Sequence, residues 1–339
     1  MVSRTVKLGG TASDITVAPV AHGLMAMTWT PNPPDEEQCF ASIKAGVDAL
    51  PSGTKAFLNS GEFYAMDHGT GNLELLSRFY AKYPEYADKT FLSVKGGIRN
   101  MAPDGSIECL RASVDNIQRA LGPNKKLDLF EPARIDRKTP IETIMNNLVT
   151  LLKEGKFSHI GLSECNANTL RKAHAVYPVT AAEIEVSFWS YDDNQQALIS
   201  TARELNVSVL AYSPLGRGYF TGAFKSPNDL PAGDPRSRFT RFKEENFKAN
   251  YAIVEGVSAI AEKKGVTPSQ LCIAWVSSLG PHMIPLPGSS KASRTLENLQ
   301  GGDIVLTPEE SKAINDILAA NPVAGDRYFG ADVDVHLWG

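Results

Sequence analysis

The chain has 339 residues, of which 42% are hydrophobic and 21% are charged, and its formal net charge is −4. This is the composition of an ordinary globular protein with enough apolar material for a sizeable core. The slightly acidic balance argues against a nucleic-acid partner, which usually requires a basic patch or stripe. No apolar run reaches the roughly 18 residues that a membrane-spanning helix needs. We therefore expect a soluble protein without nucleic-acid or membrane partners.

The cysteines and the two ends of the chain predict a cytosolic location. Four cysteines lie far apart and form no C-x-x-C pair, which is typical of buried, reduced thiols. They are Cys39, Cys109, Cys165 and Cys272. The amino-terminal segment lacks the apolar core of a secretory signal, and the last residues match none of the common sorting signals. We expect a monomer or a weak homo-oligomer.

Short apolar runs alternate with stretches of helical periodicity along most of the chain. Such alternation predicts a parallel sheet, and eight strands suit a closed (β/α)8 TIM barrel formed by residues 1–339 as a single domain. The length also allows two domains. A doubly wound open sheet is the alternative, although no G-x-G-x-x-G follows the first strand. The predicted strands are Ala18–Ala21, Ala56–Leu58, Phe91–Val94, Leu127–Phe130, His159–Leu162, Val179–Ile184, Val207–Ala211 and Met283–Leu286.

Helix signals fall between these strands. Thr139 is predicted to cap a helix that has Pro140 at its first position and ends at Gly155. Thr267 and Thr307, each followed by proline, predict two further helix starts. Another helix shows an apolar face at Leu110, Val114, Ile117 and Leu121.

Three segments fall outside the strand–helix repeat. Residues 1–17, with a Gly-Gly pair inside them, predict an amino-terminal β-hairpin. Residues 216–250 form a long irregular stretch rich in proline, glycine and arginine after the seventh strand. Loops of this length are usually functional or disordered. Residues 321–339 form a carboxyl-terminal tail.

Polar residues follow several of the predicted strands. Asn59 and Tyr64 come after the second strand, Lys95 after the third and Ser163 after the fifth. In a barrel these strand ends meet on the face that carries the chemistry. An ammonium beside a phenol stabilises the phenolate and lowers the tyrosine pKa. Tyr64 and Lys95 are therefore candidates for giving a proton to a carbonyl oxygen.

Eight segments stand in the order found in aldo-keto reductases, and the chain resembles that superfamily from about residue 15 to about residue 320. The segments are HGLMAMTW, LNSGEFYA, FLSVKGG, LDLFEPARID, GLSECN, AEIEVSFWS, LAYSPLGRG and IPLPGSSKASRTLEN. NSGEFY and LFEPARID are most similar to the fungal pyridoxal reductases. The resemblance implies a barrel enzyme that uses NADPH to reduce an aldehyde to a primary alcohol, with pyridoxal as the first-choice substrate.

The resemblance also assigns the catalytic positions, and the chain departs from the family at two of them. Tyr64 matches the proton donor, and Lys95 matches the lysine that lowers its pKa. Asn59 stands where the family has an aspartate, so we expect Lys95 to be easier to deprotonate. Ala133 stands where the family has a histidine, which would leave room for a bulky aromatic aldehyde carrying its own hydroxyl group.

Two alternatives remain open at this point. One is an aldehyde reductase acting on other aromatic or aliphatic carbonyls. The other is an NADPH-binding regulatory subunit with little turnover, which the missing aspartate and histidine favour and which the retained Tyr64 and Lys95 oppose.

The substrate side is expected to include Trp29, Ala133 and His68, the last weighed as a replacement for the missing histidine. Arg134 is predicted to point away from the site and to form a structural salt bridge. Candidates for an aromatic pocket wall are Trp29, Phe63, Tyr219, Phe220, Tyr328, Phe329 and Trp338. An acidic and histidine-containing group in the tail resembles a metal site only superficially, so no metal is expected. Its members are Asp332, Asp334 and His336.

Cofactor residues follow from the resemblance one at a time. Ser163 matches a serine that binds the nicotinamide amide, and Tyr212 matches an aromatic residue that stacks on the nicotinamide ring. Residues 288–291 begin a helix after the last strand, where free N–H groups favour an anion such as the 2′-phosphate of NADPH. The loop 216–250 would adjoin the cofactor. The full expected set is Gly23, Met25, Ser163, Glu164, Glu183, Tyr212, Ser213, Leu215, Arg217, Gly288, Ser289, Ser290, Lys291, Arg294, Glu297 and Asn298.

Overall fold

The computed structural model describes residues 2–231, 233–328 and 337–339. Eight parallel strands form one sheet in the order β12-β11-β10-β9-β8-β5-β4-β3. The sheet closes because the Ala21 amide donates to the Pro285 carbonyl at 2.8 Å and the Gly23 amide donates to the Pro287 carbonyl at 3.0 Å. The predicted (β/α)8 barrel is thus confirmed and the open sheet is excluded. The strands are β3 (His22–Gly23), β4 (Ala56–Gly61), β5 (Thr90–Gly96), β8 (Leu129–Pro132), β9 (His159–Ser163), β10 (Ala181–Glu185), β11 (Ser208–Tyr212) and β12 (Met283–Leu286).

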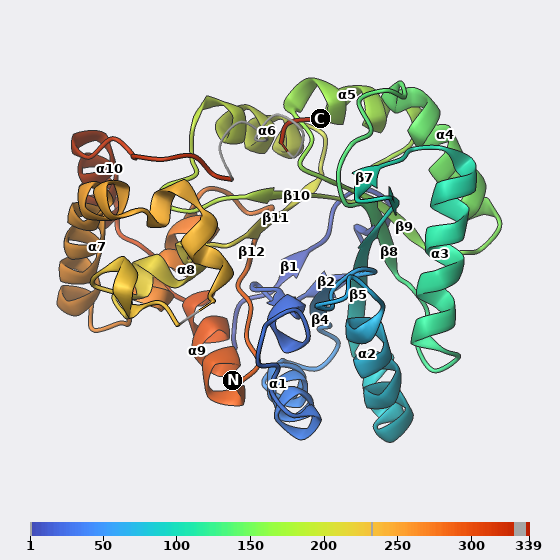
Figure 1. The fold of residues 1–339 in the computed structure, drawn as a ribbon, viewed down its shortest axis with the longest axis horizontal. Helices are drawn as coiled ribbons and strands as arrows, with labels where there is room; N and C mark the ends of the chain where they lie inside the picture. The colour runs from blue at the N-terminus through green and yellow to red at the C-terminus, as the bar shows by residue number, and fades with distance from the viewer. Residues whose placement is uncertain (1, 232, 329–336) are drawn as a thin grey trace.

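Helices surround the strands in chain order, so that α9 returns to lie beside α1 (Figure 1). In the described part of the chain, no helix combines the length and the apolar character needed to cross a membrane. The helices are α1 (Glu36–Asp48), α2 (Gly71–Lys82), α3 (Ile107–Leu121), α4 (Ile141–Lys153), α5 (Ala167–Val176), α6 (Asp193–Glu204), α7 (Glu244–Lys264), α8 (Pro268–Ser278), α9 (Ala292–Gly301) and α10 (Pro308–Ala320).

The first strand lies further along the chain than predicted. Residues 18–21 contain Pro19, which has no N–H to donate, and β3 forms only at His22–Gly23. The other predicted runs overlap observed strands, but β4 and β5 continue past their apolar residues to Gly61 and Gly96. The apolar runs predict strands that are too short, because the carboxyl ends of β4 and β5 consist of polar residues that are nevertheless buried. Those polar ends carry the candidate site.

Two of the three predicted helix caps are confirmed. The Thr267 and Thr307 hydroxyls accept from the amides of Gln270 and Glu310, as in a capping box. Thr139 is not a cap, because helix α4 begins at Ile141 and the Thr139 hydroxyl donates instead to an Asp136 carboxylate oxygen at 2.7 Å. The predicted apolar face of α3 is buried as expected.

An antiparallel hairpin of β1 (Val6–Lys7) and β2 (Thr16–Val17) covers the amino end of the barrel. Its side chains pack against barrel residues in a separate apolar cluster that includes Phe57 and Phe91. The Gly10 amide donates to the Asn206 carbonyl at 2.8 Å, so the loop of the hairpin is anchored just before β11. Because this end is filled by apolar side chains, the opposite end is left to carry polar chemistry.

The irregular stretch after β11 is shorter than the predicted 216–250, since α7 begins at Glu244. The described residues of this stretch form four short 3-10 turns: η4 (Gly216–Thr221), η5 (Pro227–Asp229), η6 (Pro235–Arg238) and η7 (Thr240–Phe242). Tyr219 and Phe220 are fully buried and pack on Trp189 and on each other. These two aromatic residues therefore belong to the core, and the prediction that they line a pocket is wrong.

We expect the Gly10→Ala variant to be strongly destabilised and use Gly53→Ala as its control. Both glycines have positive φ, +52° and +80°, so both alanines incur a backbone cost of about 1–2 kcal/mol. A Cβ on Gly10 would also lie 2.3 Å from the Val179 carbonyl oxygen, whereas nothing lies within 4 Å of one on Gly53. The clash should add about 1–3 kcal/mol in urea unfolding. Equal losses in the two variants would contradict the close packing of the hairpin.

Candidate active site

Three barrel strands bring an amide, an ammonium and a carboxylate together at their carboxyl ends. The Lys95 Nζ donates to Asn59 Oδ1 at 2.6 Å and to Glu183 Oε2 at 3.0 Å. The Asn59 Nδ2 donates to the same Glu183 oxygen at 2.7 Å. All three side chains are buried. The ammonium is therefore held by a closed triangle of hydrogen bonds across β4, β5 and β10.

Glu183 supplies the negative charge that Asn59 lacks, which corrects the expectation that Lys95 is easily deprotonated. Burial lowers the pKa of Lys95, but the Glu183 charge and other neighbours outweigh it, so the pKa is raised above its ordinary value. Asn59 alone, in the family's aspartate position, does not determine the charge beside Lys95, because Glu183 reaches the ammonium from another strand. Glu183, expected to contact the cofactor, has its Oε2 engaged by Lys95 and Asn59.

Tyr64 lies next to this triangle. Its ring centroid is 5.4 Å from the Lys95 Nζ, and the side chain is buried. Burial raises the pKa of Tyr64 and outweighs the lowering by the nearby Lys95 charge, so the net pKa is raised, and the prediction of a lowered value is wrong. The Thr28 hydroxyl donates to the Tyr64 carbonyl at 2.5 Å and fixes the backbone of this turn. A phenol held in its neutral form beside a charged ammonium is suited to donating a proton.

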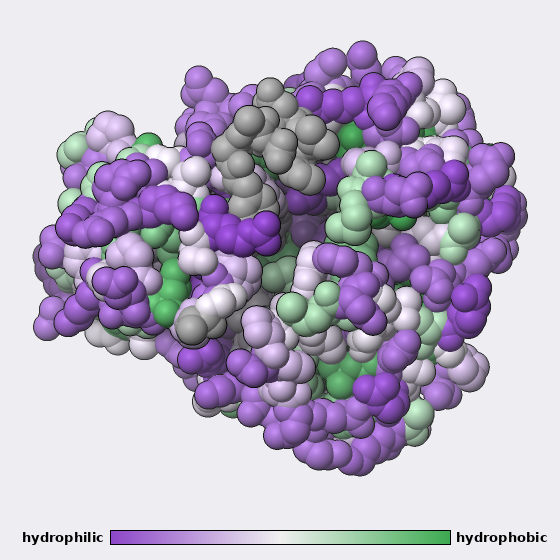
Figure 2. All heavy atoms as spheres, viewed as in Figure 1, coloured by the Kyte–Doolittle hydropathy of each residue, from purple (hydrophilic) through white to green (hydrophobic). Residues whose placement is uncertain are grey.

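Aromatic side chains adjoin Tyr64 on one side. The Trp29 ring centroid lies 5.5 Å from that of Tyr64, 5.9 Å from that of Phe63 and 5.6 Å from that of His68. His68 is exposed and Ala133 is buried. Figure 2, in the same view as Figure 1, shows a hollow near the middle of this face. The structure thus groups Trp29 and His68 with Tyr64.

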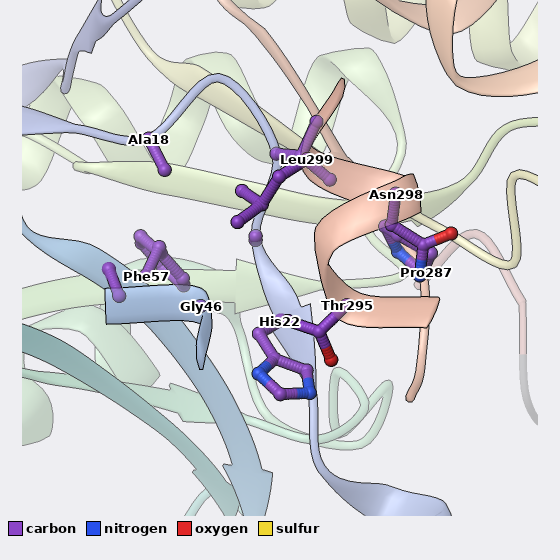
Figure 3. Close-up of a pocket in the computed structure, with 11 residues that line it drawn as sticks. Ala18, His22, Gly46, Phe57, Pro287, Thr295, Asn298 and Leu299 are labelled. Atoms are coloured by element: carbon purple, nitrogen blue, oxygen red, sulfur yellow. The ribbon is translucent and has the colours of Figure 1, made fainter. Parts of the chain in front are cut away.

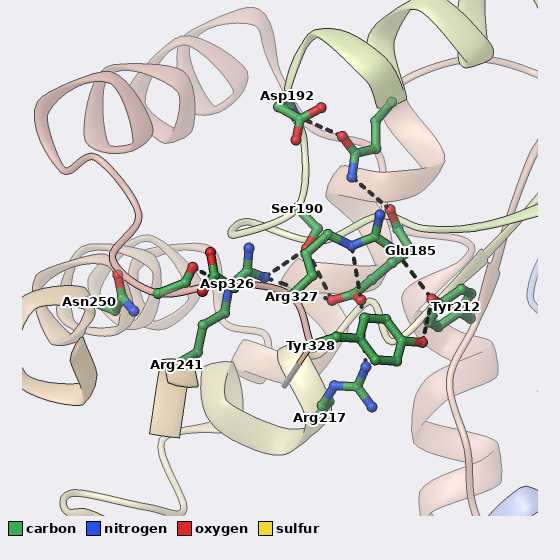
Figure 4. A network of polar contacts seen from close by, with 12 residues as sticks. Glu185, Ser190, Asp192, Tyr212, Arg217, Arg241, Asn250, Asp326, Arg327 and Tyr328 are labelled. Atoms are coloured by element: carbon green, nitrogen blue, oxygen red, sulfur yellow. Dashed lines mark hydrogen bonds and ion pairs between the residues drawn. The ribbon is translucent and has the colours of Figure 1, made fainter. Parts of the chain in front are cut away.

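A second buried network joins the predicted cofactor side to the tail (Figure 4). The Arg327 guanidinium donates to Glu164 Oε1 at 2.7 Å and to Glu185 Oε2 at 3.3 Å, and the Tyr212 hydroxyl donates to the same Glu164 oxygen at 2.7 Å. Burial tends to raise the pKa of Glu185, but the charges of Arg327, Arg217 and Arg241 hold it below its ordinary value. Glu164 Oε1, in a side chain expected to contact the nicotinamide amide, thus binds Arg327 and Tyr212.

Tyr328 extends this network across the barrel mouth. Its hydroxyl accepts a hydrogen bond from Arg134 at 2.9 Å and lies 3.2 Å from the Tyr212 hydroxyl. The Arg217 guanidinium lies 5.5 Å from the Tyr328 ring centroid and 4.2 Å from that of Phe239. Arg134 therefore binds a tyrosine in place of the predicted salt bridge. Arg327 was not singled out from the sequence, in which it is one arginine near the end of the chain.

Whether the residues present fit a nicotinamide cofactor can be tested on their unpartnered polar atoms. The Ser163 hydroxyl, at the end of β9, is buried without a hydrogen-bond partner among the described residues. One Arg217 nitrogen also lacks a hydrogen-bond partner there, although it lies 3.6 Å from Glu185 Oε2 in an ion pair. Gly23 and Gly288 approach so closely that a Cβ on Gly23 would lie 3.3 Å from the Gly288 Cα. These features fit a ligand that carries both an amide and phosphates. The Ser163 hydroxyl and Glu164 Oε2 are unpartnered among the described residues, whereas Glu164 Oε1 and Glu183 Oε2 are already engaged.

The loop before α9 is held in place by a buried histidine. The His22 Nε2 lies 2.7 Å from the Ser289 carbonyl oxygen, and the Ser289 hydroxyl lies 3.2 Å from the Lys291 amide. Burial lowers the pKa of His22, so the ring is neutral and donates from Nε2. Lys291 and Arg294 are exposed at the start of the helix. The arrangement leaves two cations beside a helix amino terminus, where an anion is favoured.

A small cavity of about 20 Å³ lies beside this loop between β3, α1 and α9 (Figure 3). His22, Thr295 and Asn298 contribute polar atoms to its wall, and the remaining lining is apolar. The volume accommodates at most one water molecule. It is a packing void behind the loop rather than a substrate pocket. Asn298 is buried at its edge, which places this residue behind the helix start.

The remaining expected cofactor residues are distributed as follows. Met25 is exposed in the 3-10 turn η2 (Met25–Met27) after β3, and Glu297 accepts from the Thr267 hydroxyl at 2.7 Å. Ser213 and Leu215 lie directly after β11 and are partly buried. Ser290 follows Ser289 in the loop before α9. Phe329, Asp332, Asp334 and His336 lie outside the described residues, and the described part of the chain holds no cluster suited to a metal ion.

Comparison with known proteins places the chain among reductases. The model of the aldo/keto reductase family matches residues 19–319. A probable pyridoxal reductase 2 of Schizosaccharomyces pombe is 35% identical over 319 residues, which are 92% of this chain and 95% of that protein. A putative pyridoxal reductase of Saccharomyces cerevisiae is 35% identical over 91% of this chain and 94% of its own. The structure of a glycerol dehydrogenase from Gluconobacter oxydans superposes with a TM-score of 0.80 at 26% identity, covering 98% of this chain and all of that one.

We expect Arg327→Ala to destabilise the fold by about 3–5 kcal/mol, because it leaves the buried Glu164 carboxylate without its cation. Arg171→Ala is the matched control. Arg171 also pairs with a glutamate, but both side chains are about half exposed, so its loss should cost less than about 1 kcal/mol. Urea unfolding of the two variants measures the difference. Similar small losses would show that the tail does not neutralise the buried carboxylates.

Proposed function

Because the chain belongs to the aldo/keto reductase family, whose members use nicotinamide cofactors, we propose that it uses NADPH to reduce pyridoxal to pyridoxine. The observation that carries this proposal is the buried contact of Tyr64 with the Lys95–Glu183 pair. The names of the two fungal relatives support pyridoxal as the substrate. The four cysteines are free and buried, which fits work in the reducing cytosol.

In the proposed reaction the Tyr64 hydroxyl gives its proton to the carbonyl oxygen of the aldehyde. Lys95 stabilises the phenolate that remains, because its ammonium lies beside the ring and is kept charged by Glu183. Asn59 orients both partners, accepting from Lys95 and donating to Glu183. Burial of the whole triangle strengthens these interactions, since they operate away from water.

The cofactor, when bound, supplies the hydride that reaches the aldehyde carbon. We assign its amide to Ser163, whose buried hydroxyl has no other partner among the described residues. Its diphosphate is assigned to the segment with Leu215 and Arg217, and its 2′-phosphate to Lys291 and Arg294 at the start of α9. The close approach of Gly23 and Gly288 keeps this edge free of side chains.

The substrate side supports an aromatic aldehyde. Trp29 and Phe63 present ring edges and faces next to Tyr64, where an aromatic ring would pack. Ala133 occupies little space at the position where the family has a histidine. A pyridoxal ring, which brings its own phenolic hydroxyl, would fill that space and form polar contacts there.

We expect Tyr64→Phe to lower kcat for pyridoxal by about 10²–10⁴-fold, the usual contribution of a positioned acid. NADPH affinity should stay unchanged, because the ring volume is kept. Absorbance of NADPH measures turnover with pyridoxal and with a panel of simple aldehydes, and fluorescence titration measures binding. If the protein reduces other aldehydes but not pyridoxal, the proposed role of Tyr64 stands and pyridoxal is rejected as the substrate. Tight NADPH binding without turnover of any aldehyde would favour a regulatory role.

We expect Lys291→Ala and Arg294→Ala each to weaken NADPH binding by about tenfold or more, which is about 1.4 kcal/mol or more. NADH lacks the 2′-phosphate, so its affinity should change little. Lys312→Ala on α10 serves as the control, since among the described residues this exposed lysine forms an ion pair only with Asp316 in the same helix. Equal effects on NADPH and NADH would place the 2′-phosphate elsewhere.

A further inference from the structure

A second carboxyl group, Glu131 of β8, lies inside the barrel behind the proposed catalytic residues. Its side chain is fully buried, and its Oε1 accepts from the Ser93 hydroxyl at 2.7 Å. Its Oε2 is buried without a hydrogen-bond partner among the described residues. Glu131 is the register partner of Lys95 in the neighbouring strand. No role in the mechanism above uses it.

Gly161 of β9 provides the room for this carboxyl. A Cβ at Gly161 would lie 3.3 Å from the Glu131 Cβ and 2.8 Å from a Leu129 methyl carbon. The missing side chain on β9 leaves space between β8 and β10, the strands that carry Glu131 and Glu183. The two carboxyl groups therefore face the same interior space as the Lys95 ammonium.

The charges in this interior space favour one protonation state of Glu131. One ammonium faces two carboxyl groups, and Lys95 already donates to Asn59 and Glu183. If both carboxyl groups were ionised, the buried centre would carry one excess negative charge away from water, which is costly. A neutral carboxylic acid also has an O–H to donate, and the adjacent Glu183 carboxylate is an acceptor.

We propose that Glu131 is a protonated acid hydrogen-bonded to Glu183, so that the two carboxyl groups hold one negative charge against Lys95 and keep Tyr64 able to donate its proton. Glu131 is in this sense a positioning residue, acting on Tyr64 through Glu183 and Lys95. The inference rests on the proposed function only for the roles of Tyr64 and Lys95.

The surrounding groups agree with this state. Burial and then the Glu183 charge raise the pKa of Glu131 to about 8, while Lys95 and Ser93 act to lower it. An ionised Glu131 also contributes to raising the pKa of Tyr64, after β4, and of Cys165, after β9. As the pH rises through about 8, Glu131 loses its proton. The added negative charge raises the pKa of Tyr64 and makes the phenol a weaker acid.

The raised pKa of Glu131 also makes the stability of the folded protein depend on pH. The folded pKa lies above the ordinary value of 4.5, so the folded protein binds more protons than the unfolded chain between these limits. Stability contributed by this group is therefore highest below about pH 4.5 and falls as the pH rises to about 8. Glutamine, which is neutral at every pH, should remove this fall.

The test compares the wild-type protein with Glu131→Gln, Ser93→Ala and Glu62→Gln. In the wild type, kcat for aldehyde reduction should fall with a midpoint near pH 8, and Glu131→Gln should abolish that fall. Ser93→Ala removes a hydrogen bond that favours the ionised form, so the midpoint should move upward. Glu62, a partly buried carboxyl whose pKa is raised by burial, accepts hydrogen bonds from Ser113 and Asn116. Its glutamine variant should keep the wild-type midpoint.

Two readouts need no turnover and therefore separate this inference from the proposed function. The infrared band of a protonated carboxylic acid should be present at about pH 6, disappear as the pH rises through about 8, and be absent in Glu131→Gln. The unfolding free energy should depend less on pH in that variant. If Glu131→Gln does not fold, the upward shift in Ser93→Ala decides. An unchanged alkaline midpoint or an unchanged acid band in a folded Glu131→Gln would overturn the proposal.

Discussion

The ion pair of Lys95 and Glu183 is the interaction on which the candidate site depends. A buried ammonium without an anion would be expelled or deprotonated, and a tyrosine beside it would then lose the charge that stabilises its phenolate. The pair spans β5 and β10, which are not neighbours in the sheet, so only closure of the barrel brings the two side chains within 3.0 Å. The hairpin at the amino end and the hydrogen bonds from residues 21 and 23 to residues 285 and 287 therefore contribute to catalysis indirectly, by holding the barrel closed.

Two glutamates at positions expected to contact the cofactor each use one carboxylate oxygen in an internal ion pair. Glu183 is neutralised by Lys95, and Glu164 by Arg327. Each of these glutamates brings a buried negative charge, and each is matched by a cation that reaches it from a distant part of the sequence. In the proposed cofactor complex, the amide is assigned to Ser163, whose hydroxyl, like Glu164 Oε2, is buried and unpartnered among the described residues. The acidic residues thus rearrange the polar contacts without leaving an unpaired charge.

The sequence was informative where a local pattern has a local cause. Alternating apolar runs and helix caps predicted the barrel, and the ordered motifs predicted Tyr64 and Lys95 as neighbours. The sequence did not predict side-chain pairs whose two members are brought together only by the folded barrel. Arg327 meets Glu164 across 163 positions of sequence, and nothing near either residue marks the pairing. Glu131 was likewise part of a quoted motif, but its importance follows from sharing the barrel interior with Glu183, which depends on strand register and on Gly161.

The tail and the segment after β11 are linked through the same buried charges. Arg327 bridges Glu164 and Glu185, and Arg217 and Arg241 also face Glu185. Tyr328, the next residue, contacts both Tyr212 and Arg134. Displacing the tail would leave two buried carboxylates with fewer cations and would uncouple Tyr212 from Tyr328, so the cost of moving it is electrostatic as well as steric. A cofactor that places its diphosphate against Arg217 would compete with Glu185 for that guanidinium, and Arg327 and Arg241 would then remain to hold the Glu185 charge.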